Sequence, residues 1–109
     1  MASIATKGSR SNKMQRWRWI RDWLRTHQHA DILDSDFVWA YIEEFNAGAS
    51  VQFIGAPTCR QLGRDLGAMF KAEYLERSIV GISDGMCHMG FPKWVYSYKL
   101  SDIAVLLDD

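Results

Sequence analysis

Four residues with cationic or small side chains, Arg60, Arg64, Gly67 and Lys71, follow the spacing i, i+4, i+7 and i+11. At about 3.6 residues per turn this spacing places them on one face of a helix, and Gln61 flanks that face. Guanidinium groups bind guanine edges and phosphates, a side-chain amide pairs with adenine, and small residues allow a close approach. The stripe is suited to contact with double-stranded DNA, although an ordinary solvated helix face has the same composition.

The element that carries this stripe is predicted to be a helix from Thr58 to about Glu73. Thr58 is a candidate N-cap residue, and Pro57 at the first helical position is the alternative. When Leu62 is taken as the inward direction, four more apolar or sulfur-containing residues fall on the same side of the helix: Cys59, Leu66, Met69 and Phe70. We expect that side to be core, and the basic stripe to be exposed.

Two further helices are predicted before this one. The first runs from Lys13 to about Thr26, with an apolar stripe formed by Met14, Trp17, Ile20 and Leu24. Trp19 lies off that stripe, so it either packs on a neighbouring element or is partly exposed. The second helix spans Asp36 to Phe45, with Asp34 or Ser35 as its N-cap.

Extended structure is predicted in three places. A short piece covers residues 51–54, followed by a turn at 55–57, and two longer strands cover 75–82 and 93–100. The loop between these strands, 83–92, contains two glycines and is expected to protrude as a wing. The last residues, 101–109, either cover a sheet edge or contact a second copy.

Charge is distributed unevenly along a chain whose net charge is zero. Residues 1–30 contain one acid, Asp22, and seven cations: Lys7, Arg10, Lys13, Arg16, Arg18, Arg21 and Arg25. Residues 31–50 contain five acids and no Lys or Arg. This asymmetry is compatible with a partner of one sign at one end of the molecule. Internal pairing between a basic and an acidic helix explains it equally well.

Composition excludes several classes of protein. A chain of 109 residues with 48% hydrophobic content fits one domain, which we expect at residues 13–100. A disordered basic tail at 1–12 is expected before it, and a C-terminal tail at 101–109 after it. No apolar run is long enough to span a bilayer, so no membrane partner is expected. Cys59 and Cys87 have no paired spacing and no export signal precedes them, which predicts reduced thiols in the cytoplasm.

No catalytic or cofactor motif is present. Cys87, His88, His27 and His29 lack the paired spacing of metal ligands, and no phosphate loop or nucleophile elbow occurs. We therefore expect no enzyme activity, no metal and no cofactor.

The stretch from Ala56 to Leu66 (APTCRQLGRDL), followed by Tyr74-Leu75-Glu76-Arg77 and the predicted hairpin, resembles the winged-helix superfamily of DNA-binding domains. The resemblance covers Lys13 to Leu100. It implies an α+β fold with a three-helix core and a C-terminal β-hairpin wing. One departure is that such proteins often place a short strand between the first and second helices, whereas the extended piece expected here lies between the second and third.

The resemblance also implies which residues contact DNA. Arg60, Gln61, Arg64 and Lys71 would face the major groove, Arg77 would meet the backbone near the wing, and Lys93 would lie at the far end of the wing. The leading hypothesis is a small double-stranded-DNA-binding protein that regulates transcription.

The predicted wing supports an alternative from another functional class. Met86, Met89 and Phe91 are apolar where a DNA-binding wing usually carries Arg or Lys, and Met-rich surfaces suit adaptable protein contacts. The alternative is a winged-helix module that binds a protein partner through this wing, or forms a homodimer. A wing folded back onto the body explains the same residues.

Overall fold

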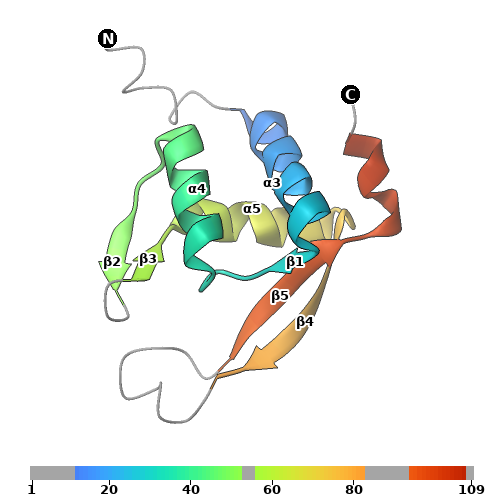
Figure 1. Cartoon of the computed structure of the whole chain (residues 1–109). Helices are drawn as coiled ribbons and strands as arrows, with labels where there is room; N and C mark the ends of the chain where they lie inside the picture. The colour runs from blue at the N-terminus through green and yellow to red at the C-terminus, as the bar shows by residue number, and fades with distance from the viewer. Residues whose placement is uncertain (1–11, 53–55, 83–93, 108–109) are drawn as a thin grey trace.

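The computed structural model describes residues 12–52, 56–82 and 94–107, and in these ranges the chain has an α+β fold. Three α-helices accompany a three-stranded antiparallel sheet and a two-stranded ribbon (Figure 1). The helices are α3 (Lys13–His27), α4 (Ser35–Phe45) and α5 (Arg60–Lys71). The sheet has the order β1-β5-β4, with β1 at His29–Ala30, β5 at Trp94–Leu100 and β4 at Leu75–Gly81. The ribbon pairs β2 (Ser50–Gln52) with β3 (Ala56–Thr58), and a 3-10 helix, η1 (Asp102–Leu107), follows the sheet.

The three helices confirm the predicted ones, and local chemistry sets most of their ends. Asn12 caps α3 in a reciprocal pair with Gln15, in which each side chain accepts from the other residue's backbone N–H. The side chain of Asp34 accepts from the backbone N–H of Phe37 at the start of α4, and Asn46 ends that helix in the left-handed conformation. The third helix begins two residues later than predicted, with Cys59 as its N-cap.

The core lies where the three helices meet the inner face of the sheet. Its buried side chains come from α3, α4, α5 and the sheet: Trp17, Ile20, Leu24, Phe37, Val38, Tyr41, Phe45, Leu62, Leu66, Met69, Leu75, Tyr98 and Ala30. Trp19 packs on α4, stacking on Phe37 at a ring-centroid distance of 6.0 Å and meeting Tyr41 edge-on at 5.8 Å. Trp19 therefore packs on a neighbouring element and is also partly exposed, so both alternatives hold.

A two-residue strand between the first two helices was not predicted. His29 pairs with Lys99 and Ala30 with Tyr98, which places β1 at the edge of the sheet beside β5. Two residues carry no alternation pattern, so nothing local marks them as a strand. The extended piece expected between the second and third helices is present as β2, and a short strand lies between the first and second helices as well, where winged-helix proteins often have one. The three helices and the sheet are compatible with a winged-helix layout.

The turn predicted at residues 55–57 was wrong for Ala56 and Pro57, because Ala56–Thr58 is the second strand of the ribbon, while residue 55 lies outside the described residues. The hairpin strands β4 and β5 match the predicted strands within a residue at each end and pair from Leu75↔Leu100 to Gly81↔Trp94. Ser101 follows β5, its hydroxyl donating to the carbonyl of Glu73, and η1 then lies against α3.

Candidate nucleic-acid interface

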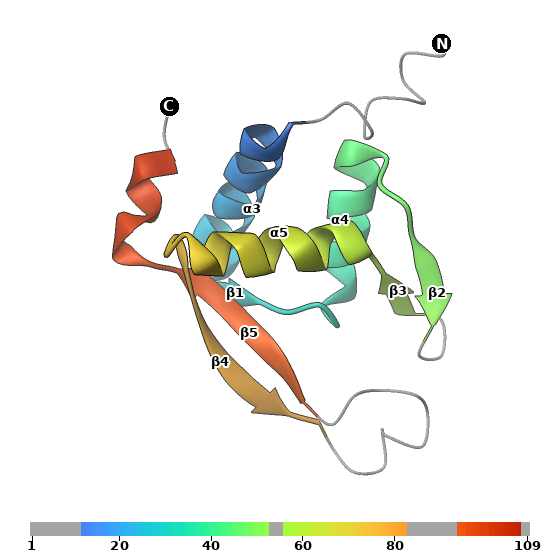
Figure 2. The same cartoon turned by 180° about the vertical axis from the view of Figure 1, so that it is seen from behind.

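Helix α5 lies across the outside of the helical layer. Figure 2 shows it crossing in front of α3 and α4, so one long side packs against the rest of the molecule and the other faces outward. Leu62 and Leu66 are each 1% exposed on the packed side. Arg60, Arg64 and Lys71 are exposed on the other side, as the sequence predicted.

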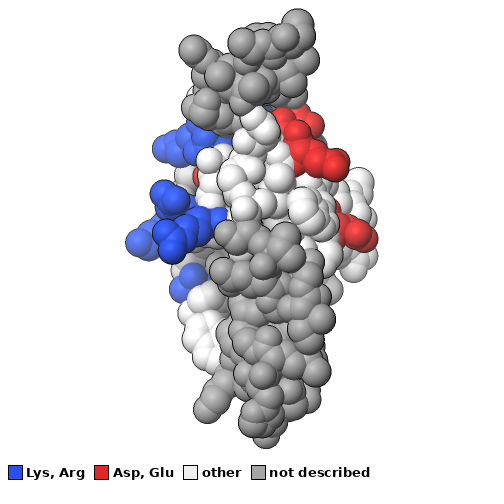
Figure 3. All heavy atoms as spheres, turned by 90° about the vertical axis from the view of Figure 1, so that its left-hand side faces the viewer, with Lys and Arg blue, Asp and Glu red and all other residues white. Residues whose placement is uncertain are grey.

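The exposed side of α5 is positively charged. The side chains of Arg60, Arg64 and Lys71 form no ion pair with any residue in the ranges that the structure describes. Asp65, the acidic residue of this helix, is only 5% exposed and faces inward. On the face of the molecule that Figure 3 shows, the Lys and Arg side chains lie along one edge of the view and most of the Asp and Glu side chains lie along the other. No acidic side chain of α5 therefore interrupts its basic face.

Asp65 is the centre of a hydrogen-bond network that joins all three helices. Arg16 of α3 donates to both carboxylate oxygens, from Nε to Oδ2 at 2.8 Å and from Nη2 to Oδ1 at 3.3 Å. The hydroxyl of Tyr41, from α4, donates to Oδ2 at 2.6 Å. Gln61, one turn before Asp65, donates from Nε2 to the Tyr41 hydroxyl oxygen at 3.0 Å. A buried carboxylate with three such donors is fully compensated and fixes the position of α5.

The network also shifts two pKa values. Burial raises the pKa of Tyr41 far above its ordinary value, and the hydrogen bond to Asp65 raises it further. The hydrogen bond to Asp65 also raises the pKa of Arg16, although burial acts against it. Tyr41 therefore remains a protonated donor throughout the neutral and moderately alkaline range.

Arg77, on β4, is held between two aromatic rings. Its guanidinium carbon lies 3.8 Å from the ring centroid of Phe70 and 3.9 Å from that of Tyr96. Phe70 belongs to the end of α5 and Tyr96 to β5, so these cation–π contacts orient the cation at the junction of helix and hairpin. A cation held in this way is suited to a fixed contact with a phosphate.

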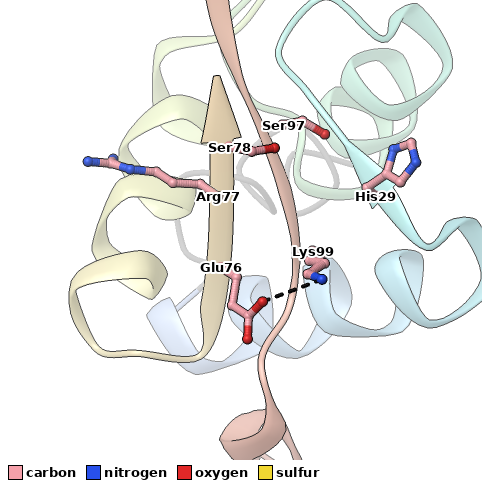
Figure 4. A pocket seen from close by; sticks show the side chains of 6 residues that line it. All are labelled: His29, Glu76, Arg77, Ser78, Ser97 and Lys99. Atoms are coloured by element: carbon pink, nitrogen blue, oxygen red, sulfur yellow. Dashed lines mark ion pairs between the residues drawn. The ribbon is translucent and has the colours of Figure 1, made fainter. Parts of the chain in front are cut away.

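A polar hollow of about 310 Å³ lies on the outer face of the sheet and is lined by His29, Glu76, Arg77, Ser78, Ser97 and Lys99 (Figure 4). The side chain of Arg77 points away from the other five. Lys99 pairs with Glu76 at 3.5 Å, which leaves little net charge in the hollow. This surface is separate from the basic face of α5.

The predicted contact residues have different placements. The exposed side of α5 carries Arg60, Arg64 and Lys71. Gln61 is half-buried, and its amide donates to the hydroxyl oxygen of Tyr41. Arg77 lies between the rings of Phe70 and Tyr96. The predicted contact residues of the wing lie outside the described residues: Met86, Met89, Phe91 and Lys93. Sequence reasoning missed the partnership of Asp65, Arg16 and Tyr41. A signal was present, because Asp65 lies three residues after Leu62 and directly before Leu66, within the apolar arc of the helix.

The described ranges were predicted to hold neither a metal site nor a membrane span. They contain no cluster of three or more His, Cys, Asp or Glu that could hold a metal ion, and the ring of His27 stacks on Trp23 instead. None of the described helices combines the length and apolar character needed to span a membrane.

Comparison with known proteins gives no relative: no family model, curated protein or solved structure matches the chain.

Proposed function

We propose that this chain is a small winged-helix protein that binds double-stranded DNA, regulates transcription and reads the major groove with α5. The observation that carries the proposal is the exposed side of α5, where Arg60, Arg64 and Lys71 lack ion-pair partners among the described residues while Asp65 is buried. A positively charged helix on the outside of a small domain matches the width and the charge of the major groove.

Other features support this orientation. Arg77 is fixed where α5 meets the hairpin, in a position to contact the sugar-phosphate backbone beside the groove. Asp36, Glu43 and Glu44 are exposed on α4, a different helix from the one that carries the basic face. The zero net charge is therefore compatible with DNA binding, because the exposed side of α5 carries only positive charge while the exposed acids of α4 belong to another helix.

A second candidate is a winged-helix module that binds a protein. Exposed apolar side chains near the distal end of the hairpin favour it: Ile79 is 64% exposed, Trp94 46% and Val80 40%. Such a patch suits a partner protein or a second copy of the chain. In this function the protein acts as an adaptor or inhibitor, and neither candidate involves catalysis or a cofactor.

Replacement of Arg64 tests the leading proposal. The preferred sequence is first selected from randomised duplexes, and wild type, Arg64→Ala and Lys99→Ala are then titrated against it. Arg64→Ala should weaken sequence-preferring binding roughly tenfold or more, because one bidentate base contact contributes about 1 to 3 kcal/mol, and should leave the melting temperature nearly unchanged.

Lys99→Ala is the matched control, because it removes one positive charge from the outer sheet face without touching α5. It should bind DNA like wild type. If wild type binds no duplex at low salt, or if Arg64→Ala binds as wild type does, the DNA proposal is wrong. The hairpin patch would then be tested for protein binding.

A further inference from the structure

The direction of each hydrogen bond around Asp65 determines how Gln61 is oriented. An ionised carboxylate only accepts hydrogen bonds, so both Arg16 and the hydroxyl of Tyr41 must donate to it. A phenol has one proton, and Tyr41 uses that proton on Asp65. Towards Gln61, 3.0 Å away, the oxygen of Tyr41 can therefore only accept.

This constraint fixes the amide of Gln61. Its nitrogen must face Tyr41, because the carbonyl oxygen has no proton to donate, so the carbonyl oxygen is the amide atom turned away from Tyr41. One N–H is bound to Tyr41, which leaves the second N–H and the carbonyl oxygen without a partner from this network. The amide thus has a defined orientation before any ligand arrives.

The second N–H and the carbonyl oxygen of this amide have no partner among the residues that the structure describes, and Gln61 lies on the flank of the basic face. Gln61 follows Arg60 directly and precedes Arg64 by three residues, nearly one turn of α5. An amide oxygen beside an amide N–H is complementary to adenine in the major groove, where N6 donates and N7 accepts. An amide of reversed orientation would keep its oxygen on Tyr41, where two acceptors would face each other.

We propose that Gln61 recognises an adenine, with its amide oriented in advance by Tyr41, which Asp65 and Arg16 hold in turn. This inference rests on the proposed DNA-binding function and adds one base of its specificity. Gln61 is the contacting residue, and Tyr41 is a positioning residue that touches no base. Orientation before binding favours recognition because the side chain loses less conformational freedom on contact.

A double-mutant cycle tests the proposal. Sequence preferences are measured on randomised duplexes for wild type, Tyr41→Phe, Gln61→Ala and the double variant. Wild type should prefer adenine at one position by roughly tenfold, and Gln61→Ala should lose that preference. Tyr41→Phe should lose most of the preference for adenine at that position and keep its preferences at all other positions. The double variant should show the same preferences as Gln61→Ala.

The cycle separates positioning from a structural effect. If Tyr41→Phe weakens binding to all duplexes equally, or weakens it further in the Gln61→Ala background, Tyr41 supports the helix as a whole and the inference is wrong. An unchanged preference profile in Gln61→Ala overturns it as well, while the DNA-binding function stands. Failure of wild type to bind any duplex removes the proposed function and this inference together.

A measurement on the free wild-type protein does not depend on how the variants fold. The side-chain amide protons of Gln61 should show nuclear Overhauser effects to the ring protons of Tyr41 and two well-separated shifts. Their absence would overturn the proposed orientation without bearing on whether the protein binds DNA.

Discussion

Tyr41 has its hydroxyl inside the protein, where ionisation is unfavourable. The whole residue is 0% exposed, and its proton is directed at the carboxylate of Asp65. Deprotonation would place a phenolate against that carboxylate in a medium of low polarity. The folded protein therefore binds this proton much more tightly than the unfolded chain does.

The free energy of unfolding should consequently fall at alkaline pH. Burial and the hydrogen bond to Asp65 raise the pKa of Tyr41 in the folded state, whereas an unfolded tyrosine titrates near about pH 10. The stabilisation is fully present below about pH 10 and is lost as the pH rises from there towards the folded pKa, by up to about 1.4 kcal/mol per pH unit. Urea unfolding between pH 8 and pH 11, roughly spanning the tyrosine pKa, should show a steeper decline for wild type than for Tyr41→Phe. Parallel declines in the two proteins would contradict this account.

Single residues also show how far sequence reasoning reaches. The exposure of Arg60, Arg64 and Lys71 follows from their spacing around Leu62, because a helix has a fixed period. The role of Asp65 does not follow in the same way, since its partners come from two other helices. Only the packing of α3 and α4 against α5 brings Arg16 and Tyr41 to that carboxylate.

At the scale of elements, α5 contains two glycines that its own stability does not require. A Cβ added at Gly63 or at Gly67 would meet no atom within 4 Å in the described structure. Glycine in a helix interior is less favourable than alanine by about 1 kcal/mol. Gly67 lies in the basic stripe, between Arg64 and Lys71, where a small residue permits close approach of a ligand.

Replacement of these glycines separates stability from binding. Gly63→Ala and Gly67→Ala should each stabilise the protein by about 0.5 to 1 kcal/mol, seen as a higher melting temperature. Gly67→Ala alone should weaken duplex binding, because its methyl group lies at the proposed DNA contact. Equal duplex affinities for the two variants would mean that α5 does not approach DNA along this stripe.

The elements divide into those with a local signal and those without one. Helices α3, α4 and α5 and strands β4 and β5 were predictable, because each is long enough to show a period or a β-branched and aromatic composition. Strand β1 exists because Ala30, 3% exposed, fits the core while its backbone pairs with Tyr98. Strand β3 contains Pro57, which favours a turn in isolation and is accommodated here in a ribbon of two short strands.

At the scale of the whole molecule, the separation of charge predicts a moderate salt dependence. Arg60, Arg64, Lys71 and Arg77 are the proposed contacts, and three or four neutralised phosphates give a slope of about −3 for log K against log salt concentration. The exposed acidic residues of α4 should contribute little, because they lie on another helix than the basic face and surface charges are screened beyond about 10 Å at 0.1 M salt.

Duplex titrations at several salt concentrations check this slope. Arg60→Ala should make it shallower by about one unit, in proportion to one lost phosphate contact. Glu43→Gln, which raises the net charge from the acidic side, should leave it unchanged. Should Glu43→Gln change the slope as much as Arg60→Ala does, the net charge and not the α5 face would govern binding.

The pairing of β1 with β5 also governs the order in which the protein can fold during synthesis. His29 pairs with Lys99, so this part of the sheet cannot form until the chain has been synthesised beyond Lys99. The aromatic contacts of Trp19 with Phe37 and Tyr41 link neighbouring helices and can form much earlier. We therefore expect folding to begin with the contacts between α3 and α4 and to end with the pairing of β5 beside β1, a strand synthesised long before it.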